Sequence, residues 1–212
     1  MCTTQNENMN HVTETACALF RSGCLKFGTF KIKSGVLSPY YIDLTWLLSS
    51  PRDLSYIAHI VADKIKKIRL YEPIDKLASI ELKGALILPS ITSTLNIPSV
   101  VVRKAEKKYG LTGRIVGGTV RKGENLLFFD DVISEGTSKL EGINPLEDLG
   151  AHVNHIMVIV DREQGGKENM NKLGYNLHAL TTISGLIKAL LQSSRISKEV
   201  SETILSYIKD KG

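Results

Sequence analysis

The chain has 212 residues, of which 42% are hydrophobic and 23% charged, and it carries a formal net charge of +5 with a pI of about 9.0. These values exclude a fibre and a disordered chain, and they predict a globular protein with a substantial buried core. A modest basic excess with both signs interspersed attracts anions, and phosphorylated metabolites account for it without nucleic acid or an acidic membrane.

The cysteines and histidines indicate neither a disulfide framework nor a metal site. The three cysteines are Cys2, Cys17 and Cys24, an odd number whose spacing fits neither paired disulfides nor zinc. We therefore predict free thiols in a reducing cytoplasm. His152 and His155 are three residues apart, but no third ligand lies near them in the sequence, and we do not expect them to bind a metal.

The N-terminal third alternates between helical and extended patterns. Its first ten residues are polar and lack the apolar core of a signal peptide, so we expect a loose tail there. No apolar run of the chain is long enough to span a membrane. The apolar spacing then predicts a helix over 12–22, a strand over 27–33 and an extended segment over 40–43. A second helix should begin at Ser50, because Pro51 suits the first helical position.

Short apolar runs then alternate with segments of helical length. We predict strands at 76–80, 99–103, 125–129 and 153–160, a helix at 84–95, and C-terminal helices near 185–192 and 198–209 with Ser184 and Ser197 as caps. Runs that are apolar on both faces and are spaced by helices indicate a parallel sheet that is covered on both sides. The predicted fold class is therefore α/β with a mainly parallel central sheet.

The segment most informative about chemistry is NLLFFDDVISEGTSK, residues 125–139, in which an apolar strand runs into two acids and a short polar loop. Backbone amides of such a loop at a helix N-terminus bind anions. Gly136 permits close approach of a phosphate, and the hydroxyls of Ser134, Thr137 and Ser138 can donate to it. The two carboxylates can accept hydrogen bonds from ribose hydroxyls at the sheet edge where α/β proteins bind ligands. Neither a Walker A loop nor a dinucleotide fingerprint is present.

This segment resembles the phosphoribosyl pyrophosphate (PRPP) signature of type I phosphoribosyltransferases. Three more segments are similar to orotate phosphoribosyltransferases in particular: FGTFKIKSGVLSPYYIDL at 27–44, VVRKAEKKYG at 101–110 and VDREQGG at 160–166. The resemblance covers residues 12 to 190 in order. It implies the type I fold as a single domain over 11–212, with a small N-terminal hood over 11–45 and a core over 50–212.

The resemblance also implies which residues bind PRPP. The implied catalytic residues are Asp130 and Asp131, which would hold the ribose hydroxyls, and Lys104 and Lys107, which would neutralise pyrophosphate from a loop of the neighbouring subunit. If that loop were helical, Lys104, Lys107 and Lys108 would share a face. The full expected PRPP set is Lys33, Leu82, Lys83, Arg103, Lys104, Lys107, Tyr109, Asp130, Asp131, Val132, Ile133, Ser134, Glu135, Gly136, Thr137 and Ser138.

The orotate site implied by the same resemblance consists of Tyr41, Ile42, Ser134 and Arg162. Arg162 would bind the orotate carboxylate, because a planar guanidinium matches a carboxylate. The implied reaction is transfer of 5-phosphoribosyl from PRPP to N1 of orotate, a pentosyl (glycosyl) transfer that gives orotidine 5′-monophosphate and pyrophosphate in UMP biosynthesis. The resemblance further implies Mg²⁺ held through PRPP and water, a cytoplasmic homodimer and an orotidine-monophosphate decarboxylase partner.

Some residues depart from the family's pattern. Glu135 stands in the phosphate loop where a small residue or threonine is usual, and it should point away or pair with Lys139. Pro145 falls inside the helix that follows the loop, so we expect this helix to start late or to break at 144–145.

The alternatives at this point are a phosphoribosyltransferase for another base, a non-catalytic PRPP sensor with the same fold, and an unrelated phosphate-binding α/β protein. Arg162 argues against the first, because a neutral base needs no carboxylate partner. The single short helix before residue 27 argues against the second, because it leaves no room for a helix-turn-helix.

Overall fold

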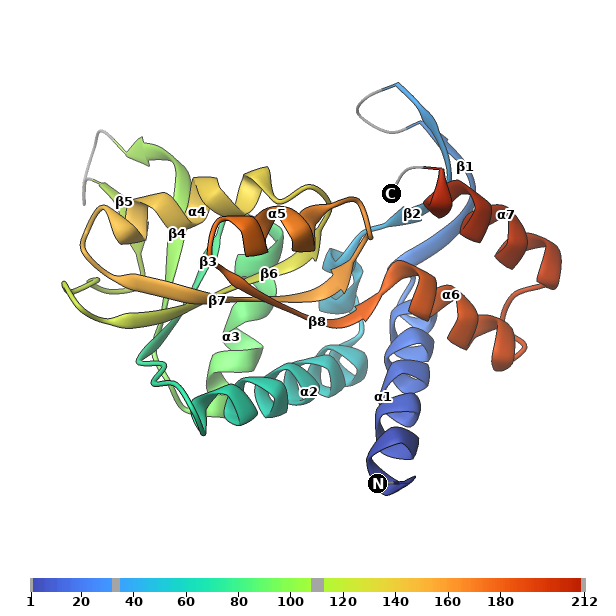
Figure 1. Cartoon of the computed structure of the whole chain (residues 1–212), viewed down its shortest axis with the longest axis horizontal. Helices are drawn as coiled ribbons and strands as arrows, with labels where there is room; N and C mark the ends of the chain where they lie inside the picture. The colour runs from blue at the N-terminus through green and yellow to red at the C-terminus, as the bar shows by residue number, and fades with distance from the viewer. Residues whose placement is uncertain (1, 32–34, 108–112, 211–212) are drawn as a thin grey trace.

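The computed structural model describes residues 2–31, 35–107 and 113–210. A six-stranded sheet with helices on both faces forms the body, and a separate two-stranded sheet stands at one end of it (Figure 1). The predicted α/β class with a mainly parallel sheet is confirmed. No helix in these ranges is both long and apolar enough to cross a membrane.

The helices are α1 (Cys2–Arg21), α2 (Pro51–Arg69), α3 (Lys83–Leu95), α4 (Thr137–Glu147), α5 (Gly166–Lys172), α6 (Ile183–Gln192) and α7 (Lys198–Lys209), with a 3₁₀ helix η1 (Leu44–Ser49). The strands are β1 (Leu25–Lys31), β2 (Leu37–Ile42), β3 (Lys76–Ile80), β4 (Ser99–Lys107), β5 (Gly113–Val116), β6 (Asn125–Ile133), β7 (His152–Asp161) and β8 (Asn176–Thr182). Each predicted strand and helix has a counterpart among these elements.

The strand order of the large sheet is β5-β4-β3-β6-β7-β8. All neighbours pair in parallel except β4 and β5, which are antiparallel. The central strands β3, β6 and β7 are buried along almost their whole length, which is the burial that their uninterrupted apolar sequences predicted. β1 and β2 pair antiparallel in a small sheet at one end, called the hood below, and α7 lies beside it against β2 (Figure 1).

Two apolar clusters pack on the two faces of the sheet. α1, α2, α3 and α6 cover one face, where Leu127, Phe129 and Met157 point. α4 and α5 cover the other, where Phe128 and Ile156 point. Adjacent residues of β6 therefore serve opposite layers, as the two-residue repeat of a strand requires.

Three predictions about element ends are wrong. α1 begins at Cys2 rather than at residue 12, because the preceding segment contains no glycine or proline to stop the helix. α6 begins two residues earlier than predicted, because Thr182 rather than Ser184 is its cap and accepts the Gly185 N–H at 3.1 Å. α4 neither starts late nor breaks: it runs from Thr137 to Glu147 through Pro145.

Ser50 occupies the predicted cap position of α2, and Pro51 is its first residue. The Ser50 hydroxyl donates to the Asp53 carboxylate at 2.7 Å and makes no side-chain cap bond of its own. Ser197 caps α7 as predicted, since its hydroxyl accepts the Val200 N–H at 3.3 Å.

Candidate active site

The two acids lie at the carboxyl end of β6, inside the strand rather than after it. Pairing aligns Asp130 with Val158 and Ile133 with Asp161, so the ends of β6 and β7 reach the same edge of the sheet. The loop Ser134–Gly136 then leads into α4. The sequence-predicted acids, phosphate loop and Arg162 are thus brought together at one edge, where open α/β sheets bind ligands.

The phosphate loop has the geometry of an anion site. Gly136 is the residue before α4, and its φ of 101° lies in the left-handed region. This backbone conformation favours glycine, while a Cβ there would lie 2.6 Å from Met170 Cε and would displace only the end of that side chain. Thr137 and Ser138 are exposed at the first turn of α4, where their backbone amides and hydroxyls can meet a phosphate.

The acids differ in their surroundings. One Asp130 oxygen accepts the Asp131 N–H at 2.9 Å, and the other forms a buried ion pair with Lys139. Among the described residues, the carboxyl of Asp131 has no ion-pair partner of this kind. Burial, and then the neighbouring charge of Asp130, raise the pKa of Asp131 to about 7.

Lys139 therefore binds Asp130, not Glu135. Its ammonium also donates to the Val132 carbonyl at 2.8 Å and to the Ser138 hydroxyl at 3.3 Å. Glu135 is exposed, and its carbonyl accepts from the Asn169 amide at 3.0 Å. Of the two expectations for Glu135, pairing with Lys139 is wrong, because the apolar stem of Lys139 passes inward from the first turn of α4.

The start of α3 approaches β6 closely at Gly84. A Cβ on Gly84 would lie 2.4 Å from the Asp130 carboxylate, so only glycine fits. The preceding residue, Lys83, forms an ion pair of 3.1 Å with Asp43 of the hood. Burial opposes the charged form of both groups, yet their mutual hydrogen bond prevails, raising the pKa of Lys83 and, together with Thr45, lowering the pKa of Asp43. Lys83 therefore reaches the edge from the side opposite the phosphate loop, with Leu82 exposed beside it.

Arg162 follows β7, and its N–H continues the ladder by donating to the Ile133 carbonyl at 2.9 Å. Its guanidinium donates to the Tyr40 hydroxyl through two nitrogens, both at 3.4 Å, and to the Ser134 hydroxyl at 3.5 Å. These are long bonds to neutral groups, so the cation lacks a carboxylate partner among the described residues.

Sequence reasoning chose Tyr41 and missed Tyr40. Tyr40 is 1% exposed and lies beneath the Arg162 guanidinium, 5.5 Å from ring centroid to Cζ. Tyr41 is 40% exposed and packs on Phe30, while Ile42 is half-buried at the edge of the core. Because neighbouring strand residues face opposite sides, the adjacent tyrosines must have different roles, and that alternation was the available signal.

Glu163 is a second residue that the sequence did not single out. Its φ is 56°, which is uncommon for a residue with a side chain. Its carboxylate accepts the Ser184 N–H at 2.8 Å and the Ser184 hydroxyl at 2.9 Å, at the first turn of α6. Its own N–H donates to Asp161 at 2.8 Å. These bonds fix the backbone at Glu163 and therefore hold the adjacent Arg162 in place.

The expected catalytic segment is a strand up to Lys107, not a helix, and β3 separates it from β6. Lys104 is exposed, and its N–H donates to the Glu81 carboxylate at 2.7 Å. Arg103 donates to the Gly113 carbonyl at 3.5 Å. Three residues of the earlier expectation, Lys33, Lys108 and Tyr109, lie outside the described residues.

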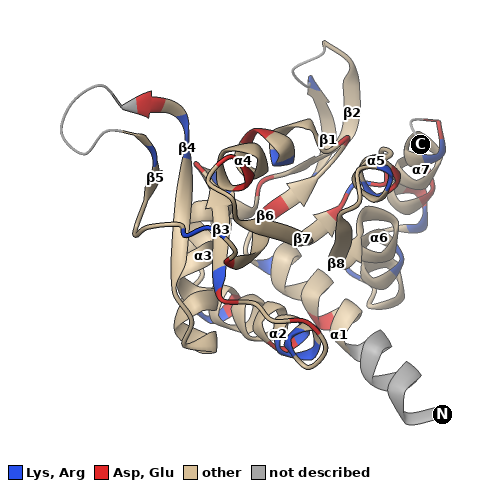
Figure 2. Cartoon of the chain, turned by 60° about the vertical axis from the view of Figure 1, so that its left-hand side comes forward, with Lys and Arg blue, Asp and Glu red and all other residues tan. Residues whose placement is uncertain are grey.

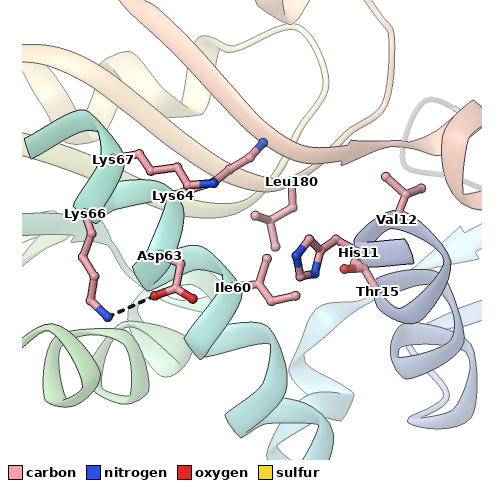
Figure 3. A pocket seen from close by; sticks show the side chains of 9 residues that line it. All are labelled: His11, Val12, Thr15, Ile60, Asp63, Lys64, Lys66, Lys67 and Leu180. Carbon is pink, nitrogen blue, oxygen red and sulfur yellow. Dashed lines mark hydrogen bonds and ion pairs between the residues drawn. The ribbon is translucent and has the colours of Figure 1, made fainter. Parts of the chain in front are cut away.

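A cavity of about 600 Å³ lies elsewhere, between α1, α2 and β8 (Figure 3). Its walls include Val12, Ile60 and Leu180, and Lys66 at its rim pairs with Asp63 at 3.0 Å. It shares no residue with the acid pair, the phosphate loop or Arg162. Basic and acidic residues are interspersed over the described helices and strands (Figure 2), as the sequence predicted.

His152 and His155 have different surroundings in the structure. His155 contacts His178 at 3.0 Å through one ring nitrogen and lies 2.9 Å from the Glu72 carboxylate through the other, while His152 is exposed. Within the described ranges no three His, Cys, Asp or Glu side chains gather as ligands would.

No family model matches the chain, but curated proteins align with most of its length. The orotate phosphoribosyltransferase of Pyrococcus horikoshii is 38% identical over 183 residues, which cover 86% of this chain and 95% of that protein. The uridine 5′-monophosphate synthase of Bos taurus is 33% identical over 91% of this chain and 39% of its own length.

Solved structures also superpose on most of this chain. The UMP synthase of Leishmania donovani superposes with a TM-score of 0.82 at 30% identity, covering 93% of this chain and 42% of that one. Orotate phosphoribosyltransferase from Aeropyrum pernix superposes with a TM-score of 0.71 at 23% identity over 86% of this chain and 99% of that one, a likeness of fold.

Proposed function

This chain belongs to the orotate phosphoribosyltransferase family, and from that premise we propose how its own residues perform the reaction. It transfers the 5-phosphoribosyl group of PRPP to N1 of orotate, giving orotidine 5′-monophosphate and pyrophosphate in pyrimidine biosynthesis. The observation that supports the proposed placement is the meeting of the acid pair, the phosphate loop and Arg162 at one edge of the sheet.

PRPP occupies the carboxyl end of β6. The amides and hydroxyls of the Ser134–Ser138 loop receive the 5′-phosphate, because the first turn of α4 presents unpaired donors and the positive end of a helix dipole. The acid pair at the strand end supplies the carboxylate that accepts hydrogen bonds from the ribose hydroxyls. Lys83 approaches from the α3 side and exchanges its hood partner Asp43 for the pyrophosphate.

Orotate lies between this edge and the hood. Its carboxylate replaces the long contacts of the Arg162 guanidinium to Tyr40 and Ser134 with charge-assisted bonds. Tyr41 and Ile42 of the hood flank the pyrimidine ring. A neutral base would leave the Arg162 cation without a partner, and this favours orotate over other bases.

The transfer needs little covalent chemistry from the protein. N1 of orotate attacks the anomeric carbon while the bond to pyrophosphate breaks, so positive charge develops on the ribose and negative charge on the leaving group. The Lys104 and Lys107 side chains neutralise the pyrophosphate, supplied by the neighbouring subunit of a homodimer. Exposed apolar side chains, among them Trp46 of η1 and Leu82 just before α3, offer a surface for a second copy.

The edge offers hard oxygen donors that suit Mg²⁺, but PRPP oxygens and water would hold the ion, with neither acid coordinating it directly. When bound, the ion offsets the charge of the pyrophosphate.

The proposal extends to the setting of the enzyme. The unpaired Cys17 and Cys24 thiols fit a reducing cytoplasm. The chain spans 39% of the bovine UMP synthase and 37% of a bifunctional enzyme of Nostoc sp., so the same unit is joined to a further one in those proteins. An orotidine-monophosphate decarboxylase is the fitting partner, because the product must lose its carboxylate to become UMP.

The test is an assay of the purified protein with PRPP, Mg²⁺ and orotate, following the loss of orotate absorbance, with uracil, hypoxanthine and adenine in parallel. Turnover of orotate alone supports the assignment of Arg162. Turnover of a neutral base at a comparable rate contradicts it, and PRPP binding without any turnover indicates a sensor.

Subunit sharing has its own test. Lys107→Ala and Arg162→Ala homodimers should each be nearly inactive, and mixing them after subunit exchange should restore activity, because one site of the hybrid then has both wild-type residues. No restoration in a mixture shown to contain hybrids would place the lysine in its own subunit's site.

A further inference from the structure

The buried ion pair beneath the phosphate loop separates the roles of the two acids. Lys139 has a side chain that is 3% exposed, and its ammonium contacts the Asp130 carboxylate, the Val132 carbonyl and the Ser138 hydroxyl. A lysine is almost never this buried unless it is paired and hydrogen-bonded. The ion pair with Asp130 and the two hydrogen bonds therefore account for the burial of Lys139.

Asp130 is bound by the protein through both carboxylate oxygens. One oxygen accepts the Asp131 N–H at 2.9 Å, and the other meets Lys139. Gly84 of α3 packs against the first oxygen, since an added Cβ would lie 2.4 Å from it and 2.7 Å from the Ser79 hydroxyl. The charged and titratable groups that face the acids are Lys139 from α4 and Lys83 from α3, the latter paired with Asp43 of the hood.

We propose that Lys139 is a built-in counter-cation that holds Asp130 away from the substrate, so that Asp131 alone of the two acids contacts the ribose. The inference rests on the proposed placement of PRPP at this edge. Lys139 is a positioning residue in this scheme, because it acts through Asp130 and touches no reacting atom.

The ion pair also sets the charge next to Asp131. With Lys139 present, the neighbouring pair is neutral, and Asp131 ionises beside it. Without Lys139, the Asp130 charge would be uncompensated at a buried site, and Asp131 would hold its proton to higher pH. A carboxylate that accepts ribose hydroxyls must be ionised to bind them best, so the loss of the lysine should appear in PRPP binding as a function of pH.

The experiment compares kcat/KM for PRPP across pH in Lys139→Met and in the double variant Asp130→Asn/Lys139→Met. Methionine keeps the volume and shape of the lysine stem. Lys139→Met should lower kcat/KM at pH 7 by about tenfold or more and move the acid limb of the profile upward by about one pH unit. The double variant removes both charges together, so it should recover about tenfold relative to Lys139→Met and return the limb toward its wild-type position.

Two controls complete the design. Asp131→Asn/Lys139→Met should show no recovery, because the substrate-facing acid is then missing. Lys172→Met, which removes an exposed lysine on α5, should keep the wild-type profile. If Lys139→Met fails to fold, the double variant still decides the question, since it leaves no unpaired buried charge.

The outcomes separate the proposals. No recovery in the folded double variant would mean that Asp130 itself contacts the ribose, and an unchanged profile in Lys139→Met would remove any role for the lysine; either result overturns the inference. A wild-type protein that does not turn over orotate would instead contradict the proposed function, before any variant is compared.

Discussion

Replacing Asp131 with asparagine should stabilise the ligand-free protein while weakening its binding of PRPP. The Asp131 carboxyl is 7% exposed and has a pKa raised from 3.8 to about 7, chiefly by burial. One pKa unit corresponds to about 1.4 kcal/mol, so ionising this group in the folded protein costs at most about 4 kcal/mol. Part of the cost is shared with Asp130, and we expect a gain of about 2 kcal/mol at pH 8.

The sign of the effect fixes its pH dependence. A carboxyl with a raised pKa in the folded state binds more protons there than in the unfolded chain, so the stability of the wild type falls as pH rises from about 4 to about 7. Asparagine does not titrate, and the difference in stability between variant and wild type should widen over that range. In a chain of this size, about 2 kcal/mol corresponds to a rise in Tm of about 4 to 8 °C at pH 8.

Thermal unfolding at pH 5 and pH 8, followed by circular dichroism, measures this difference. Asp130→Asn is the matched control: it leaves the buried Lys139 ammonium without its carboxylate and should lower Tm at both pH values. Calorimetric titration of Asp131→Asn with PRPP should show at least about tenfold weaker binding. A Tm that is unchanged or lower at pH 8, or a gain equal at both pH values, would refute the argument that ionisation of Asp131 opposes folding.

Three further predictions follow from contacts of single residues. Arg162→Ala should raise the KM for orotate by about 30-fold or more with little change in the KM for PRPP, because only orotate supplies a carboxylate; steady-state kinetics with each substrate varied will show it. Glu163→Ala should raise the KM for orotate by about three- to tenfold through loss of its Ser184 bonds, and equal effects on both substrates would contradict a role through Arg162. Gly142→Ala should lower the free energy of unfolding by about 1 to 3 kcal/mol and leave both KM values unchanged, because the new Cβ would lie 2.5 Å from the Phe128 ring in the core between α4 and the sheet; urea denaturation measures the loss of stability.

The sequence predicted the sheet well because its central strands are apolar on both faces. That pattern has few explanations other than a parallel sheet covered by helices, and β3, β6 and β7 follow it closely. It predicted element ends less well, because ends depend on single hydrogen bonds. The start of α6 was missed since Thr182 and Ser184 are equally good caps by residue type.

The site likewise contains residues that the sequence could predict and residues that it could not. The acids and the phosphate loop form one continuous segment, so the sequence could predict them together. Tyr40, Glu163 and Lys139 act through partners far along the chain or on another element: the Arg162 guanidinium, the Ser184 amide and a carboxylate nine residues away. A lysine one position after a polar loop looks like a surface residue, and only the packing of α4 on the sheet shows that it is buried.

The continuity of α4 through Pro145 has a specific cause that connects two parts of the site. A proline inside a helix leaves the carbonyl four residues earlier without its usual donor, here that of Glu141. Arg114 of β5 supplies the missing bond, donating to the Glu141 carbonyl at 3.1 Å, and its Nε donates to the Arg103 carbonyl of β4 at 3.0 Å. The Arg114 guanidinium thus bonds one carbonyl of the helix that follows the phosphate loop and one carbonyl of the strand that leads to Lys107. The proline that the sequence presents as a defect in the helix is therefore the place where the helix of the PRPP loop is tied to the segment expected to neutralise pyrophosphate.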